Sequence, residues 1–342
     1  MTKTIIETLE RAFSELRGKP IRIDALHREV CEHVSSFHAE HLKISIETNE
    51  NISVFFKDLN PDHQIETAQK VRAGDLGPSY HELRVYQQIL SRVDLGTPKL
   101  YAVRWEADSG IYWIFLEDVG TSRLRDSRNY LRWVPAARWA ARFHAFTRKL
   151  PASETSFLPV WDLAHYQRCA ERVGRILREL DSRDRRLVDQ ALEHYVGRVD
   201  WFAALPKTVI HGQFFGKNIM LRAGRGERAL AVIDWETAAL GPGAFDLVSI
   251  SSGRWTDQQR QAMWRAYFDE YQTQTGLSQR WESFCGGLRE LEVYQALEWL
   301  GWWRNRSVSH NFGRWIKELA RIMKDHARER LQKSIRTRDK SL

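Results

Sequence analysis

The sequence has 342 residues, of which 43% are hydrophobic and 28% charged, which is typical of a globular protein with one large or two modest cores. Lys and Arg number 52 against 44 Asp and Glu, and the excess of 8 positive charges is spread along the chain. This spread excludes the concentrated basic face that a nucleic-acid binder needs. The three cysteines lie too far apart for a disulfide framework or a CxxC metal site.

No segment approaches the ~18 consecutive apolar residues of a membrane span, and the N-terminus lacks the features of a signal peptide. We therefore expect a cytoplasmic protein with no membrane or nucleic-acid partner. The basic stretch 324–340 is interpreted as a solvated, polar helix end.

The first predicted element is an amphipathic helix that ends at Gly18, with Thr4 and Glu7 in the positions of a capping box. Its apolar face holds Ile5, Ile6, Leu9, Phe13 and Leu16. Alternating residues then predict an antiparallel hairpin over 41–59 with the turn TNEN. A helix over 79–90 follows, and two further strands surround the turn ADSG.

After Gly120, long helical patterns predict a second, helical part of the chain. It contains one β insertion, in which NIMLR and ALAVIDW flank the turn AGRGE. The G-x-G of this turn lies between two strands and opens no helix, so a hairpin turn is favoured over a phosphate-binding loop. The last predicted helix covers 293–315, and RWIKELARIM continues the helical pattern.

Four polar residues stand at strand ends or in tight loops: Lys57, Glu82, Asn218 and Asp234. Each alone is more simply explained as a surface or turn residue. Together they match the requirements of phosphoryl transfer: a lysine for the phosphates, a glutamate that holds it, and an amide and a carboxylate for Mg²⁺. They follow one another along the chain in the same order as these parts, and this agreement strengthens the phosphotransferase interpretation.

The runs VIHGQFFGKNIML and AVIDWETAALGPGAFDL resemble the aminoglycoside phosphotransferase and choline kinase-like family. ELRVYQQIL, FLEDV and RFHAF are similar to that family's lysine-supporting helix, its hinge and the helix before its catalytic loop. The resemblance covers residues from about 40 to 305. It implies an α+β, bilobal protein-kinase-like fold, with a small antiparallel N-terminal lobe (1–116) and a larger helical C-terminal lobe (117–342).

The resemblance also implies roles for individual residues. ATP would be held by Lys57, supported by Glu82, and by the hinge around Glu117, Asp118 and Val119, while Asn218 and Asp234 would bind Mg²⁺. His211 belongs to the catalytic loop, and Gln213 stands where the family has its catalytic Asp. Contacts with the acceptor are assigned to Glu236, Trp299, Trp302 and Trp303, although core packing explains any one of the tryptophans as well.

Two departures from the family pattern affect the function. A carboxamide cannot accept a proton at neutral pH, so Gln213 removes general-base catalysis, which is worth ~10² to 10⁴ in rate. The loose transition state of phosphoryl transfer still allows a glutamine to orient the acceptor. In addition, the turn TNEN contains no glycine where a glycine-bearing loop was expected against the phosphates.

Two hypotheses therefore stay open. The protein is either an ATP-dependent phosphotransferase that acts on a hydroxyl of a small molecule, slowed by Gln213, or a silent pseudokinase that binds a nucleotide or small molecule and acts by sequestration or partner contact. A metal site at His33, His38, Glu40 and His41 is rejected because their spacing is not HExxH. The acceptor, the choice of ATP over GTP and the oligomeric state are left undetermined by the sequence.

Overall fold

The computed structural model describes residues 1–31, 36–64, 80–222, 229–302 and 311–339, with side chains described as far as residue 328. The chain divides into two compact units, each assembled from separate segments. The first unit consists of Met1–Arg128, Ala152–Phe157 and Gly216–Ala238, and the second of Asn129–Pro151, Leu158–Phe215 and Ala239–Leu342.

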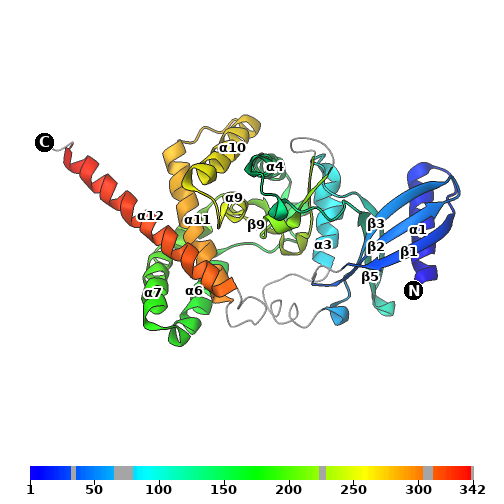
Figure 1. The fold of residues 1–342 in the computed structure, drawn as a ribbon, viewed down its shortest axis with the longest axis horizontal. Coiled ribbons are helices and arrows are strands. Elements are labelled where there is room, and N and C mark those ends of the chain that lie inside the picture. Colours follow the sequence, from blue (N-terminus) through cyan, green and yellow to red (C-terminus); the bar gives the residue numbers. More distant parts are fainter. Residues whose placement is uncertain (32–35, 65–79, 223–228, 303–310, 340–342) are drawn as a thin grey trace. The chain divides into compact units, whose positions relative to one another are not determined.

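The first unit is built on a five-stranded antiparallel sheet with the order β1-β2-β3-β5-β4 (Figure 1). Its strands are β1 (Ile23–Val30), β2 (His38–Ile46), β3 (Glu50–Asp58), β4 (Leu100–Glu106) and β5 (Ile111–Glu117). The hairpin predicted within 41–59 is the β2–β3 pair, and the strands predicted around ADSG are β4 and β5. Both predictions are confirmed.

Strand β1 was not predicted, and it changes the interpretation of the turns. It pairs with β2, so TNEN joins the second and third strands of the sheet and not the first two. The connection between the first two strands runs from Cys31 to Phe37, of which 32–35 lie outside the described residues. The glycine-free turn TNEN is therefore not the turn between the first two strands, and its assignment to that position was wrong. It is closed by Asn49 at φ 58, a left-handed conformation that asparagine tolerates better than most residues.

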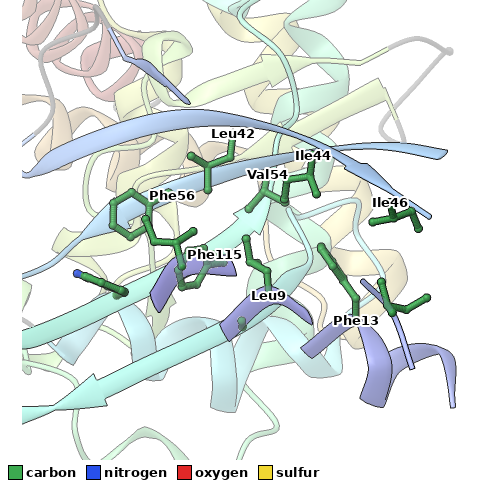
Figure 2. Packing of buried hydrophobic residues seen from close by; sticks show 12 residues of the cluster. Leu9, Phe13, Leu42, Ile44, Ile46, Val54, Phe56 and Phe115 are labelled. Atoms are coloured by element: carbon green, nitrogen blue, oxygen red, sulfur yellow. The ribbon is translucent and has the colours of Figure 1, made fainter. Parts of the chain in front are cut away.

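Helix α1 (Thr2–Arg17) packs on this sheet (Figure 2). Leu9 and Phe13 face a cluster of strand residues because they lie one turn apart on the same side of the helix. Gly18 ends the helix in the left-handed conformation (φ 64), as predicted. The capping box is wrong: Met1 is the N-cap, without a side-chain bond, and Thr4 lies inside the helix. Leu16 is 63% exposed and does not share the buried face.

The rest of the first unit consists of short elements. Helix α3 (Tyr80–Arg84) continues into a π-helical turn (Val85–Ile89), so the helix predicted over 79–90 is present from Tyr80. The predicted β insertion is the antiparallel pair β7 (Ile219–Leu221) and β8 (Leu230–Val232). Its turn AGRGE, 223–227, lies outside the described residues. Short helices complete the unit: η1 (Pro61–His63), η3 (Leu90–Arg92), η4 (Ala107–Ser109), η5 (Leu124–Asp126), α5 (Ala152–Thr155), η8 (Gly216–Asn218) and η10 (Trp235–Thr237).

The second unit is mostly helical (Figure 1). Its long helices are α4 (Val134–Thr147), α6 (Leu163–Ile176), α7 (Ser182–Val196), α10 (Asp257–Thr275), α11 (Trp281–Gly301) and α12 (Phe312–Asp339). Shorter elements are η6 (Tyr130–Arg132), η7 (Leu177–Glu179), α8 (Val199–Ala204), α9 (Ala244–Ser251) and the antiparallel pair β6 (Thr208–Ile210) and β9 (Ala239–Gly241). Helix α11 is central, since it contacts α6, α7, α9, α10 and α12.

One helix boundary differs from the sequence prediction, and the helical C-terminal stretch agrees with it. The helix predicted over 293–315 is not continuous, because α11 ends at Gly301 and α12 begins at Phe312. The basic stretch after Lys324 belongs to α12, which stays helical to Asp339. None of the helices in the described parts of the chain combines the length and the apolar character that crossing a lipid bilayer requires.

Candidate functional site

Lys57 lies on β3, a central strand of the sheet, where it pairs with Ala39 on one side and Ile114 on the other. Its side chain is buried, and its Nζ atom donates to Glu82 Oε2 at 2.6 Å and to Asp234 Oδ1 at 3.1 Å. Burial disfavours the charged ammonium, but the carboxylates of Glu82, Asp234 and Glu236 outweigh it, so the pKa of Lys57 is raised above its ordinary value. Lys57 is therefore a fixed positive charge.

Glu82 reaches Lys57 from α3, and the segment that follows β8 anchors this helix. Glu82 Oε1 accepts from the backbone N–H of Trp235 at 3.3 Å, so both carboxylate oxygens have partners. One residue earlier, His81 Nε2 lies 2.8 Å from the carbonyl oxygen of Ala238, which makes this nitrogen the proton donor. Trp235 is fully buried and donates from Nε1 to Val232 O at 3.1 Å. The glutamate is thereby held in one orientation.

The β7–β8 hairpin brings Asn218 and Asp234 to the same end of the structure. Ile219 pairs with Val232, and the N–H of Ile233 donates to Asn218 O at 3.0 Å. Asp234 has φ 67, a left-handed conformation that is uncommon outside glycine but accessible to Asp. Both side chains line a pocket that Lys57 and Glu82 also line. All four residues singled out in the sequence are thus gathered in one place.

A third carboxylate joins this group. Oxygen atoms of Glu82, Asp234 and Glu236 lie within 4.8 Å of one another. Three carboxylates against the single ammonium of Lys57 leave an excess of two negative charges, which favours a cation. Hard oxygen donors of this kind, with the amide of Asn218 on the same pocket, fit Mg²⁺. The sequence motif contained Glu236, but only the turn at Trp235–Thr237 places it beside the other two.

Two residues before β2 also meet this group, and sequence reasoning missed both. Ser36 Oγ donates to Glu236 Oε1 at 2.9 Å. Next to it, the ring of Phe37 is buried and lies 5.8 Å from Lys57 Nζ, a cation–π arrangement. The missed signal was β1, which pairs with β2 as far as Val30 opposite Glu40 and so places Ser36 and Phe37 at the end of the sheet where Ala39 pairs with Lys57.

The pocket encloses about 920 Å³ between atoms, open solvent at its mouth included. Its wall includes the segment 116–121, which is the end of β5 and the residues after it, with Phe55, Tyr86 and Met220 as further apolar lining. Glu117 and Asp118 turn their carboxylates to protein partners: Glu117 Oε2 accepts from Arg222 at 3.0 Å, and Asp118 Oδ2 lies 2.8 Å from His41 Nδ1. The N–H groups of Glu117 and Asp118 also have protein partners, since they donate to Lys99 O at 2.7 Å and to Ser53 O at 3.3 Å.

The loop with His211 and Gln213 belongs to the second unit, where Asp246 supports it. The buried Asp246 carboxylate accepts from the N–H groups of His211, at 2.7 Å, and Gly212, at 3.1 Å. Gly212 has φ 79, so the loop needs glycine there. The N–H of Gln213 donates to His211 Nδ1 at 3.2 Å, while the Gln213 side chain is partly exposed. Asp246 and His211 thereby hold the backbone of this loop on the N-terminal side of Gln213 and at its own N–H.

His144 on α4 completes the support of this loop. Its Nε2 lies 3.1 Å from Asp246 Oδ2, and since a carboxylate only accepts, Nε2 carries the proton. Its Nδ1 then accepts from the hydroxyl of Tyr267 at 2.9 Å. Burial raises the pKa of Tyr267, which keeps that hydroxyl protonated and donating. The RFHAF segment therefore acts on the loop through Asp246.

Trp299, one of the two tryptophans of this set that the structure describes, contacts this loop segment. Trp299 meets Phe215 edge to face at 5.7 Å and stacks on Trp315, also at 5.7 Å. Trp302 donates from Nε1 to Glu298 at 3.2 Å, and the guanidinium of Arg172 lies 4.6 Å from its ring centroid. Trp303 lies outside the described residues. The rejected histidine group forms no cluster among its described members, because His38 bonds Glu40 whereas His41 bonds Asp118.

A known protein family resembles this chain in sequence, and known structures resemble it in fold. The model of the phosphotransferase enzyme family matches residues 47–281. None of the curated proteins matches the sequence.

Solved structures resemble the whole chain. A choline kinase from Cryptosporidium parvum Iowa II is 12% identical, covers 98% of both chains and has a TM-score of 0.62. The wild-type aminoglycoside 2'-phosphotransferase-IIIa, solved as a GDP complex, is 12% identical with a TM-score of 0.58, covering 93% of this chain and 96% of its own. A choline kinase from Streptococcus pneumoniae is 12% identical with a TM-score of 0.56, covering 93% and 99%. The fold expected from the resemblance is therefore confirmed.

Proposed function

Because the chain belongs to the phosphotransferase enzyme family, we propose that it transfers a phosphoryl group from ATP to a hydroxyl of a small molecule, at a rate limited by Gln213. One observation carries the proposal: a buried lysine bonded to both Glu82 and Asp234, in a pocket that Asn218 and the segment 116–121 also line. A structural ion pair in a core would need neither the pocket nor the excess of carboxylates beside it.

Lys57 binds the phosphates as a point charge, and Glu82 keeps it oriented. The base lies against the backbone of Glu117, Asp118 and Val119, as the family resemblance implies. The N–H groups of Glu117 and Asp118 already donate to Lys99 O and Ser53 O, so these two N–H groups are not the ones that bind the base. Asn218, Asp234 and, in addition, Glu236 hold Mg²⁺. The ion neutralises phosphate charge when it is bound.

Gln213 orients the acceptor hydroxyl through its amide oxygen and does not remove the proton. The proton leaves late, because the transition state of phosphoryl transfer is loose. His211, which accepts the N–H of Gln213, acts by shaping the loop. The acceptor lies along Trp299, the tryptophan in contact with the loop segment through Phe215. Trp302, whose ring lies beside Arg172, is the second tryptophan assigned to the acceptor. On this proposal 1–116 forms the nucleotide-binding lobe and 117–342 the lobe that carries the loop.

A second function, a silent nucleotide-binding pseudokinase, is favoured by Phe37 and Ser36. The buried Phe37 ring beside Lys57 and the Ser36 bond to Glu236 use protein groups where phosphate and cation would make their contacts. A protein that keeps these contacts in its working state binds nucleotide weakly and acts by sequestration or partner contact.

The deciding experiment measures thermal unfolding with Mg-ATP and, in a parallel series, Mg-GTP. Wild type is compared with Asp234→Asn and with Glu29→Gln, an exposed carboxylate on β1 that serves as the control. Mg-ATP at 100 times its Kd is expected to stabilise wild type and Glu29→Gln by about 2.7 kcal/mol and Asp234→Asn far less. Equal stabilisation of all three proteins overturns the proposed site.

Turnover separates the two functions. Phosphate transfer to a panel of small alcohols is measured for wild type and Gln213→Asp. The enzyme proposal expects measurable wild-type turnover and a gain of about 10² to 10⁴ on restoring the carboxylate. Nucleotide binding without turnover in either protein, on any acceptor, supports the pseudokinase instead.

A further inference from the structure

A cluster of two histidines and a glutamate lies in the second unit, on three helices that carry none of the residues assigned above to the nucleotide or Mg²⁺. His194 is on α7, Glu290 on α11 and His326 on α12. One ligand atom from each lies within 4.8 Å of the other two, and all three side chains are partly buried. We infer that these residues form a zinc site that joins α7, α11 and α12.

The distances suit a single ion. His194 Nε2 lies 2.8 Å from Glu290 Oε2, a hydrogen bond in which the imidazole donates. Replacing that proton by a metal requires the two atoms to separate by only about half an ångström, since ligand atoms on tetrahedral zinc lie ~3.3 Å apart. The rings of His194 and His326 have centroids 5.3 Å apart. Two imidazoles on one tetrahedral zinc have centroids about 5 Å apart.

The second histidine has the outer contact that zinc ligands usually show. His326 Nε2 lies 3.3 Å from the carbonyl oxygen of Arg289, and because a carbonyl only accepts, Nε2 carries the proton. Nδ1 of the neutral ring then keeps the lone pair that a metal needs. A ligand histidine that donates its other N–H to a backbone carbonyl is held in a fixed tautomer and ring orientation.

The ligand set points to zinc and not to magnesium. Imidazole nitrogens suit Zn²⁺, whereas Mg²⁺ takes oxygen ligands. Three protein ligands leave a fourth position for water. Arg198 and Arg289 are competing charges: Arg198 has Nε 3.8 Å from Glu290 Oε2, and its guanidinium also lies over the ring of Trp201, at 5.0 Å. The guanidinium of Arg289 lies over the ring of Trp264, at 5.9 Å.

The site is tested on the full-length protein stripped of metal, with excess Mg²⁺ present to occupy the oxygen ligands around Asp234. Zn²⁺ affinity is measured by competition with a chromogenic chelator. Co²⁺ is the spectroscopic probe, because visible d–d bands report a low-coordinate site with nitrogen ligands. We expect one equivalent bound per chain, a visible Co²⁺ spectrum and a rise in Tm of several degrees with Zn²⁺.

His194→Gln and His326→Gln are each expected to weaken Zn²⁺ binding at least tenfold and to abolish the rise in Tm. His27→Gln, an exposed histidine on β1, and Asp234→Asn are expected to bind as wild type does. The metal-free Tm of each variant shows whether it folds. Absence of the Co²⁺ spectrum in wild type, or unchanged Zn²⁺ affinity in both histidine variants, overturns the site whatever the outcome for nucleotide binding.

Discussion

Lys57 and Asp234 are joined by a 3.1 Å bond from Nζ to Oδ1, although 177 positions separate them in the sequence. The same ammonium also bonds Glu82, so one buried charge is shared by two carboxylates that come from different elements. A lysine has three N–H donors, so a phosphate oxygen can take the third without displacing either carboxylate. Because Lys57 is shared in this way, substitutions of its partners should affect both the stability of the first unit and its proposed activity.

Glu82→Gln is the sharpest test of that sharing. The amide keeps the shape of the side chain but not its charge, so Lys57 is held mainly by Asp234 and is drawn toward it. We expect the free energy of unfolding to fall by about 1–3 kcal/mol in urea denaturation. We also expect the apparent affinity for Mg-ATP, measured from the stabilisation that it gives, to fall at least tenfold. Glu106→Gln, whose partner Arg104 lies at the surface of β4, is the control and should change neither quantity. Unchanged Mg-ATP affinity in Glu82→Gln would contradict the role of the pair.

Asp246→Asn tests the support of the loop in the second unit. Asp246 accepts from His144 and from the N–H groups of His211 and Gly212, and an amide turned either way places its NH₂ against one of these donors. We expect a loss of about 2–4 kcal/mol in the free energy of unfolding, because a buried charge-assisted network is broken. Asp189→Asn, exposed on α7, should stay within about 0.5 kcal/mol. A similar small loss at Asp246 would show that the loop does not depend on it.

The family motifs identified the candidate site in the sequence. Strand and helix periodicity then placed Lys57 on a strand and Glu82 on a helix. The patterns NIMLR and ALAVIDW around a short turn predicted a hairpin between Asn218 and Asp234, and the structure contains its two paired strands. Such signals are local, so they survive without any knowledge of packing. Glu236 was visible as a residue, but its position beside Glu82 depends on α3 docking against the turn after β8.

Strand β1 could not be predicted by the same means. It is an edge strand that exposes most of its residues, so IDALHREV lacks the alternation of a half-buried strand. Because β1 was not predicted, the turn TNEN was taken to join the first two strands of the sheet. For the same reason, Ser36 and Phe37 were not recognised as residues near the site. The capping box failed because Thr4 and Glu7 fit the pattern equally well inside a helix, and the N-cap of α1 is Met1, three residues before Thr4.

Glu40 predicts how the first unit responds to acid. Burial alone would raise its pKa, but bonds from Arg28, at 2.6 and 2.7 Å, and from His38 outweigh burial, so the pKa of Glu40 lies below its ordinary value. The unfolded chain therefore takes up this proton first as the pH falls. The stabilising contribution is complete above about pH 5 and is lost as the pH falls through the lowered pKa.

Glu40→Gln removes that titration. We expect it to cost about 1–3 kcal/mol in the free energy of unfolding at pH 7, with the difference from wild type shrinking below about pH 4.5. Urea denaturation at pH 7, 5, 4 and 3.5 measures it. A difference that stays constant down to pH 3.5 would mean that the carboxylate titrates alike in the folded and unfolded chains.

Phe37→Ala distinguishes the two proposed functions through affinity. The Phe37 ring is 3% exposed and lies 5.8 Å from Lys57 Nζ, so a phosphate that approaches Lys57 must compete with it. Exposing a buried phenylalanine costs about 1.5–3 kcal/mol, which corresponds to a ten- to hundredfold penalty in nucleotide affinity. Removing the ring removes that penalty, and we expect Mg-ATP to bind about tenfold more tightly, although the protein loses thermal stability. Calorimetric titration of Mg-ATP measures the change, with Phe55→Ala on the wall of the same pocket as the matched control, since it should weaken binding. Weaker binding in Phe37→Ala would mean that the ring supports the nucleotide, and the buried ring would then no longer favour the pseudokinase.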